Sequence, residues 1–204
     1  MLEVALVLGV LAGAVGVADT LPYIRDMRRG TTRPHRGTWL VWTVLSIGAY
    51  LAHGAEGPRW SLVMLAVQVA LNCLVLALSV RLGVGGLGRA DLLMLGMAGA
   101  GIAGWMIIGD PLVATLCIIA ADLLGVAMMT PKAWRDPSSE TSSTYALASL
   151  SGLLAAGAVG SMEPALLLYP IYYALVNGGL ALLLRVRTAR LAVAPRLVPG
   201  RSLG

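Results

Sequence analysis

The sequence has no phenylalanine, only two cysteines and few charged residues in a chain of 204 residues. Charged residues make up 12% of the chain, against about 25% in soluble domains. Hydrophobic residues make up 58%, more than a soluble domain of this length is able to bury. The shortage of charge therefore excludes a soluble catalytic domain and predicts an all-α polytopic membrane protein.

Several site classes are excluded by what is missing. Cys73 and Cys117 both lie inside apolar runs, so they provide neither a disulfide framework nor a zinc-binding spacing. We expect no metal and no cofactor. The net charge is +5, but the arginines are spread over several loops without interleaved aromatics, so we expect no nucleic-acid partner.

The apolar residues form continuous runs. The runs cover residues 2–24, 38–55, 60–82, 91–108, 111–131, 144–161 and 163–185. A membrane-spanning helix needs about 20 residues, so these lengths predict seven transmembrane helices. The first run has no basic residues before it and is not expected to be a signal peptide.

The basic residues predict the orientation of the chain. All of the 15 lysines and arginines except Arg59 lie in loops on one side of the predicted spans or in the C-terminal tail. The positive-inside rule makes that side cytoplasmic, with the N-terminus outside and the C-terminus inside.

The two halves of the chain resemble each other. The segment Pro22-Tyr-Ile-Arg-Asp26 is similar to Pro131-Lys-Ala-Trp-Arg-Asp136, and Asn72 and Asn177 lie in similar runs in the third span of each half. We predict two parallel three-helix repeats, 1–82 and 111–187, joined by a linker helix in 83–110, and a disordered basic tail over 188–204. Parallel repeats place a binding site at their interface near the membrane midplane.

These residues resemble the PQ-loop/SWEET superfamily of small transporters. The shared features are the 3+1+3 layout, a proline at the end of the first span of each repeat and an asparagine in the third span, over residues 2–187. The proline-glutamine dipeptide is not present, because Pro22 precedes Tyr23 and Pro131 precedes Lys132. The resemblance, to a divergent bacterial branch, implies alternating-access transport of a small polar metabolite, sugar- or vitamin-like, across the bacterial inner (plasma) membrane.

Five residues form the predicted substrate-binding set: Asn72, Asn177, Asp122, Trp42 and Tyr173. The resemblance implies that the two asparagines face a central cavity, where a carboxamide both donates and accepts hydrogen bonds. The alternative is that each asparagine makes an interhelical hydrogen bond.

Two acids lie within the predicted spans. Asp122 is near the middle of its run, where a carboxyl group is costly and usually faces the bundle interior. We expect it to have no basic partner, to carry a proton for part of a functional cycle, and to bond substrate or an asparagine or threonine. Asp19 lies one turn before Pro22; it either acts in the site or pairs with Arg25 or Arg28.

Three further expectations concern ring side chains. Trp39 and Trp42 begin the second run and are expected to be anchors at the headgroup level, with substrate stacking as the alternative for Trp42. Tyr173 follows Pro170 and is expected to line a pore. His35, in the basic loop, is expected to be solvated.

A second function remains open from the sequence. Seven-span terpene cyclases use buried carboxylic acids as general acids, and Asp122 and Asp19 fit that role. A central cavity that reaches water favours a carrier, whereas an apolar chamber open to lipid favours a cyclase. The expected partners are a small-molecule substrate and the bilayer; the oligomeric state stays open, with a homo-oligomer as one alternative.

Overall fold

The computed structural model describes residues 2–55, 61–86, 88–108, 111–160, 162 and 164–193. The order of elements is α1 (Leu2–Ala18), α2 (Thr20–Arg28), α3 (Arg36–Ala55), α4 (Ser61–Leu82), α5 (Arg89–Ile108), α6 (Pro111–Arg135), the 3-10 turn η1 (Pro137–Ser139), α7 (Ser142–Ala158) and α8 (Pro164–Val193). Within these residues the only β-type pairing is an isolated bridge between His35 and Val84. The predicted all-α class is therefore confirmed.

Each apolar run contains a helix, with α1 and α2 together covering the first run. Among the described residues, three helical stretches are long and apolar enough to cross a membrane: Glu3–Arg28, Thr115–Arg135 and Leu166–Ala192. Helix α8 continues through Thr188 to Val193, so the beginning of the expected disordered tail is helical. Residues 194–204 and Arg59 lie outside the described residues.

Two prolines at similar sequence positions have different local effects. The helix is interrupted between α1 and α2 at Asp19. Pro22 explains the break, because it has no amide proton for the carbonyl of Ala18 and its ring crowds that carbonyl. Pro131 instead lies inside α6, which continues to Arg135.

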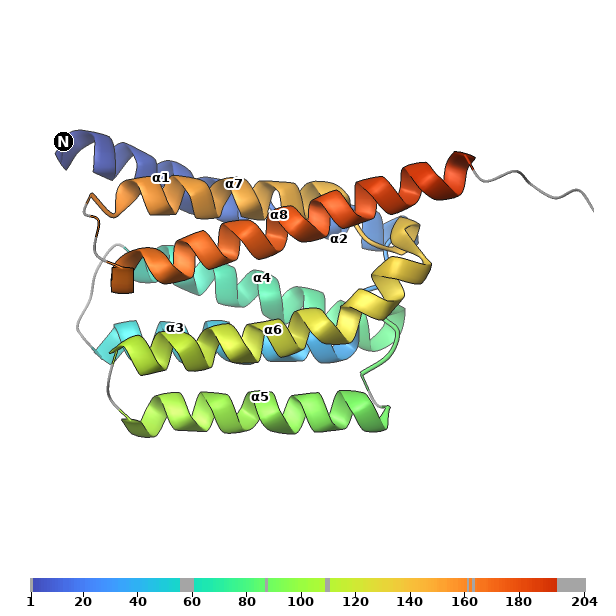
Figure 1. Cartoon of the computed structure of the whole chain (residues 1–204), viewed down its shortest axis with the longest axis horizontal. Coiled ribbons are helices and arrows are strands. Elements are labelled where there is room, and N and C mark those ends of the chain that lie inside the picture. The colour runs from blue at the N-terminus through green and yellow to red at the C-terminus, as the bar shows by residue number, and fades with distance from the viewer. Residues whose placement is uncertain are drawn as a thin grey trace, which may run out of the picture.

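The helices lie side by side in one bundle (Figure 1). Helices α1, α4, α6 and α8 run in one direction, and α3, α5 and α7 run in the other. The loops after α2, α4 and α6 and the C-terminal end of α8 therefore lie at one end of the bundle, which we call the basic end because these segments carry lysine and arginine.

Helix contacts follow the same pattern in the two halves of the chain. In the first half α4 contacts α1 and α3, and in the second half α8 contacts α6 and α7. Between the halves, α1 packs on α7 and α3 packs on α6, while α5 packs on α6 and α3 at the edge of the bundle. Exchanging α1, α3 and α4 for α6, α7 and α8 thus leaves these contacts unchanged.

Small residues allow the closest helix approach, between α7 and α8. A Cβ atom at Gly152 would lie 2.8 Å from the backbone nitrogen of Ala174. Ser149 Oγ also donates a hydrogen bond of 2.8 Å to the Ala174 carbonyl. Small side chains at helix interfaces permit such contacts.

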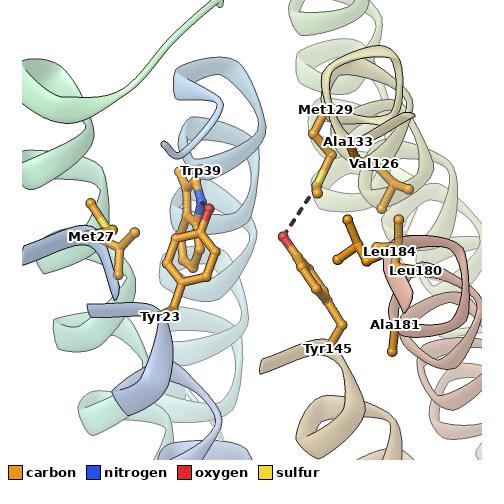
Figure 2. Packing of buried hydrophobic residues seen from close by; sticks show 11 residues of the cluster. Tyr23, Met27, Trp39, Val126, Met129, Ala133, Tyr145, Leu180, Ala181 and Leu184 are labelled. Carbon is orange, nitrogen blue, oxygen red and sulfur yellow. Dashed lines mark hydrogen bonds between the residues drawn. The ribbon is translucent and has the colours of Figure 1, made fainter. Parts of the chain in front are cut away.

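The largest buried apolar cluster lies at the basic end (Figure 2). It consists of Tyr23, Met27, Trp39, Val75, Val126, Met129, Ala133, Tyr145, Leu180, Ala181 and Leu184. These side chains come from α2, α3, α4, α6, α7 and α8, so both halves contribute. Elsewhere many large apolar side chains are exposed on the outside of the bundle, among them Leu6, Leu93, Leu153 and Leu175.

Candidate functional site

Asp122 lies in the middle of the bundle and is only 7% exposed. The hydroxyl of Tyr172, from α8, donates a hydrogen bond of 2.6 Å to Asp122 Oδ2. No lysine or arginine within the described residues pairs with this carboxyl group. The expected hydrogen bond to substrate or to an asparagine or threonine stays a prediction, and the partner that the structure shows is a tyrosine.

Trp42 reaches the same region from α3. A Cβ atom at Gly125 would lie 3.4 Å from Trp42 Nε1, so the indole packs on the bare backbone one turn after Asp122. The indole N–H is buried and makes no hydrogen bond of normal geometry, but it lies close enough to the Asp122 carboxyl group to act on it as a donor. Trp42 thus supplies a second donor beside a buried acid.

Three tyrosines on one face of α8 extend this site. The ring of Tyr169 lies 6.2 Å from that of Tyr172 and 6.0 Å from that of Tyr173, centroid to centroid. Tyr173 lies within electrostatic range of both Asp19 and Asp122. We call Asp19, Trp42, Asp122, Tyr172 and Tyr173 the central cluster; its members come from both halves of the chain.

Asp19 is the second buried acid of the central cluster, at 6% exposed. Thr20 Oγ1 donates a hydrogen bond of 2.9 Å to Asp19 Oδ1. The expected alternative, a pair with Arg25 or Arg28, is wrong. Arg25 instead pairs with Asp26, at 2.8 Å between Nε and Oδ1.

The two asparagines are buried, but each bonds within its own half. Asn72 Nδ2 donates to the carbonyl of Trp42 at 3.3 Å, and Gln68 Nε2 donates to Asn72 Oδ1 at 3.1 Å. Asn177 Nδ2 donates to the carbonyl of Tyr173 at 2.9 Å. In the described residues α4 and α8 do not contact each other. The structure does not bring the two asparagines together, and their facing each other across a cavity stays a prediction.

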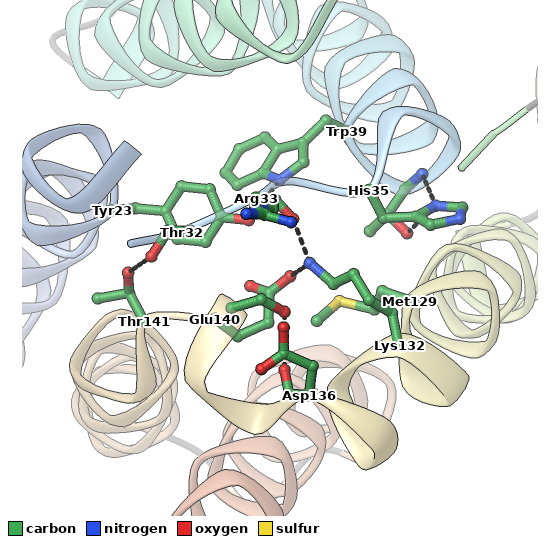
Figure 3. A network of polar contacts seen from close by, with 12 residues as sticks. Tyr23, Thr32, Arg33, His35, Trp39, Met129, Lys132, Asp136, Glu140 and Thr141 are labelled. Atoms are coloured by element: carbon green, nitrogen blue, oxygen red, sulfur yellow. Dashed lines mark hydrogen bonds and ion pairs between the residues drawn. The ribbon is translucent and has the colours of Figure 1, made fainter. Parts of the chain in front are cut away.

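A second polar group closes the basic end (Figure 3). The side chain of Glu140 is 1% exposed and forms an ion pair with Lys132, whose side chain is 15% exposed. Tyr145 donates a hydrogen bond of 2.8 Å to Glu140 Oε2. Lys132 also donates to the backbone carbonyl of Arg33, in the first half of the chain. The buried carboxylate is therefore neutralised and hydrogen-bonded.

The two halves are joined around this ion pair. The hydroxyls of Thr32 and Thr141 lie 2.6 Å apart, and Thr141 also donates to Asp26 Oδ2 at 3.1 Å. The backbone nitrogen of Arg33 donates to the Ser139 carbonyl at 2.9 Å. We call these residues, with Lys132, Glu140 and Tyr145, the basic-end network. It joins the loop after α2 to the loop after α6.

The residues that follow the two similar prolines meet in this network. Tyr23 follows Pro22 and Lys132 follows Pro131, and both side chains lie beside Glu140. Glu140 and Tyr145 were not among the site residues expected from the sequence. The repeated proline was the signal that could have found this site. Residues that follow it in the two halves are expected to occupy equivalent places at the interface between the halves.

Two expectations about ring side chains at this end are wrong. Trp39 is 4% exposed and donates from Nε1 to the Tyr23 hydroxyl at 3.1 Å, so it is no surface anchor. His35 is 5% exposed rather than solvated. Gly85, in the left-handed region at φ 66°, allows the loop after α4 to pack on the imidazole ring, because a Cβ there would lie 2.3 Å from Nε2.

Charges around His35 are mixed. Asp91 Oδ1 lies 3.6 Å from His35 Nε2, and Lys132 and Arg36 are also close enough to act on the ring. Burial lowers the pKa of His35, and the attraction of Asp91 offsets only part of this effect. No group of three or more histidine, cysteine, aspartate or glutamate side chains in the described residues is placed to hold a metal ion.

Two surface grooves accompany these sites. One, of about 780 Å³, is lined by Leu123, Met162, Leu167, Leu168, Ile171, Tyr172, Leu175 and Val176. It is apolar, lies where α8 borders α6, and includes the residue after Asp122 and the tyrosine bonded to it. The other, of about 360 Å³, lies at the end of α2.

Comparisons with known proteins identify no relative: no family model matches the chain, and no curated protein or solved structure matches it at a significant level.

Proposed function

We propose that this chain is a seven-span carrier or facilitator for a small polar metabolite, of the PQ-loop/SWEET type. One observation carries the proposal. The halves contact each other through equivalent helix pairs, α1 with α7 and α3 with α6. Parallel repeats that rock against each other around a shared site are a common basis of alternating access.

The proposed orientation follows from the charges at the basic end. With that end in the cytoplasm of a bacterial cell, the N-terminus is outside and the basic loops obey the positive-inside rule. The three helical stretches that are long and apolar enough to cross a membrane support membrane insertion. The exposed apolar side chains on the outside of the bundle then face lipid.

The central cluster is the proposed substrate site. Asp122 and Tyr172 form a polar pair inside the bundle, and the indole N–H of Trp42 lies beside the Asp122 carboxyl group as a further donor. Asn72 and Asn177 border this region, one from each half. Hydroxyl, indole and carboxamide groups suit a neutral or weakly charged polar substrate, because they bind it without leaving an isolated charge buried.

The basic-end network is the proposed cytoplasmic gate. Hydrogen bonds between Thr32 and Thr141 and between Arg33 and Ser139 join the halves, and the buried apolar cluster fills the space around them. In this state the central cluster is closed from the cytoplasm. Opening requires these contacts to separate while Lys132 and Glu140, both in the second half, stay paired.

Counterflow in proteoliposomes tests the proposal. Vesicles loaded with unlabelled sugars or nucleoside-like vitamins, one at a time, are expected to accumulate the labelled compound when it is a substrate. Asp122→Asn keeps the shape but releases no proton, and we expect it to abolish proton-coupled uptake. The control is Asp136→Asn, the same change at an exposed acid, which is expected to leave uptake unchanged.

One result contradicts the transport function, and a second contradicts the role of Asp122. Absence of counterflow for all of these compounds in folded protein removes the carrier function. Full uptake by Asp122→Asn, with loss only in Asp122→Leu, reduces Asp122 to a packing residue.

A membrane-embedded terpene cyclase is the second candidate, and the apolar groove favours it. The groove of about 780 Å³ adjoins the Asp122–Tyr172 pair and has the apolar lining that a polyene needs. Asp122, and less directly Asp19, would act as the general acid. Incubation of the same vesicles with a polyprenyl epoxide, followed by mass spectrometry, tests this. A cyclised product without counterflow replaces the carrier proposal.

A further inference from the structure

Helix α2 has two faces of different chemistry. Thr20, Tyr23 and Met27 are buried against the bundle. The opposite face carries Leu21, which is 57% exposed, and Arg25, about one turn further on. Residues at such spacing lie on the same side of a helix. The outer face therefore changes from apolar to basic along the helix axis.

A groove of about 360 Å³ lies on this outer face. It is lined by Leu21, Ile24, Arg25, Arg28 and Arg29. Along the axis of α2, Leu21 and Ile24 lie nearer the middle of the bundle, and the three arginines lie nearer the basic end. This order matches an amphiphile that presents its anionic group at the membrane surface and its chains further in.

The charges in the groove leave a net positive site. Arg25 is paired with Asp26, but Arg28 and Arg29 are exposed at the end of the helix. The planar guanidinium group presents several donors in a fork that matches the oxygens of a phosphate. Arginine near the C-terminal end of a helix also interacts favourably with the helix dipole. The dipole is a reason for the arginines, but it gives no reason for Leu21 and Ile24 to line the same groove.

We propose that this groove binds the phosphate headgroup of an anionic phospholipid in the cytoplasmic leaflet, with Arg28 and Arg29 on the phosphate and Leu21 and Ile24 against the first part of an acyl chain. The inference rests on the proposed orientation in the membrane. We assign the groove to a lipid rather than to free phosphate, because free phosphate makes no favourable contact with the two apolar side chains.

Lipid-dependent thermal stability of the full chain in a neutral detergent tests this inference. A ligand that binds only folded protein raises its apparent stability. Phosphatidylglycerol is expected to raise the unfolding temperature, and phosphatidylcholine is expected to leave it unchanged. Arg28→Gln/Arg29→Gln is expected to raise the lipid concentration needed for the effect roughly thirtyfold.

The matched control removes the same charge elsewhere on the basic end. Arg81→Gln/Arg89→Gln alters the end of α4 and the start of α5, on either side of the loop between them, and is expected to respond to phosphatidylglycerol like the unchanged chain. Leu21→Gln is expected to weaken the response with all arginines present. Equal losses in both double variants overturn the inference, since the response then reflects the general charge of this end.

Two other outcomes also overturn it: an equal shift with inorganic phosphate alone, and an unchanged response in Leu21→Gln. The assay needs neither a transport substrate nor a membrane orientation. An absence of counterflow would therefore count against the proposed function alone, whereas a reversed orientation found with reporter fusions would also overturn the assignment to the cytoplasmic leaflet.

Discussion

Glu140 and Asp122 are both buried carboxyl groups, but their surroundings differ. Glu140 has a lysine partner and a tyrosine hydroxyl, and Tyr23 lies beside it. Asp122 accepts a hydrogen bond from the hydroxyl of Tyr172, and the indole N–H of Trp42 lies close enough to interact with it. A neutralised, fully bonded acid serves structure, whereas an acid without a cation is available to bind a ligand or to exchange a proton.

Removal of the Lys132 charge is expected to give the largest loss of stability. Lys132→Met leaves Glu140 buried without its cation, and breaking a buried pair in this way costs about 3–5 kcal/mol. Thermal unfolding in detergent measures the loss. Arg25→Met is the control, because it breaks an exposed ion pair with Asp26 and is expected to change the unfolding temperature little. Equal stability of the two variants would show that Glu140 does not depend on Lys132.

Helix packing supplies the next largest effect. Gly152→Ala places a methyl group against the backbone of Ala174, and overpacking of this kind costs about 1–3 kcal/mol. At Gly179, also in a helix, a Cβ meets no atom within 4 Å, so Gly179→Ala is expected to stabilise the protein by about 0.5–1 kcal/mol. The same unfolding assay compares the two. Similar values would mean that α7 and α8 lie further apart than described.

Neutralising Asp122 is expected to change stability less. Asp122→Asn keeps an acceptor for Tyr172 and strands no opposite charge, so we expect a change within about 1 kcal/mol. Unfolding of this variant beside Lys132→Met sharpens the comparison between the two acids. A loss as large as that of Lys132→Met would make Asp122 a structural residue too.

The smallest expected effect is a pH dependence at His35. Its pKa is lowered in the folded protein by burial, with Asp91, Lys132 and Arg36 as the nearby charges. The unfolded chain, with a histidine pKa of about 6.5, then binds a proton more readily, so stability falls as the pH drops below that value. His35→Gln is expected to flatten the unfolding temperature between about pH 7 and 5 relative to the unchanged chain. An identical slope in the variant would exclude His35 as the cause.

The helices could be predicted from the sequence more fully than the site. Long apolar runs become helices because the backbone must satisfy its own hydrogen bonds in an apolar medium. The lengths of two helices were underestimated where they reach the basic end: α6 continues to Arg135 and α8 to Val193. The basic residues there are not hydrophobic, so they end the apolar runs. They still have a high helix propensity, so the helices continue past the runs.

The central cluster could be predicted only in part. The position of Asp122 in its run indicated burial without a cation, whereas its partner depends on the rotation of α8 against α6, which no local pattern specifies. Glu140 lies in a segment rich in proline and serine, a composition that is typical of a solvated loop. Its burial results from contacts with Lys132 and Tyr145 on two different helices. His35 was misassigned for the same reason, because the loop after α4 covers it.

Access to the central cluster from each side of the membrane tests the account most directly. The experiment uses Thr32→Cys/Thr141→Cys to cross-link the basic-end network, Asn177→Cys as a reporter, and alanine at Cys73 and Cys117. Before oxidation, an impermeant thiol reagent is expected to label the reporter from either side. After oxidation, it is expected to label the reporter from the outer side but no longer from the cytoplasmic side. Oxidation of a chain with the reporter alone is the control and is expected to leave labelling from both sides unchanged. Undiminished cytoplasmic labelling after cross-linking, or no labelling from either side, would contradict a gate at the basic end and a site that opens alternately to the two sides.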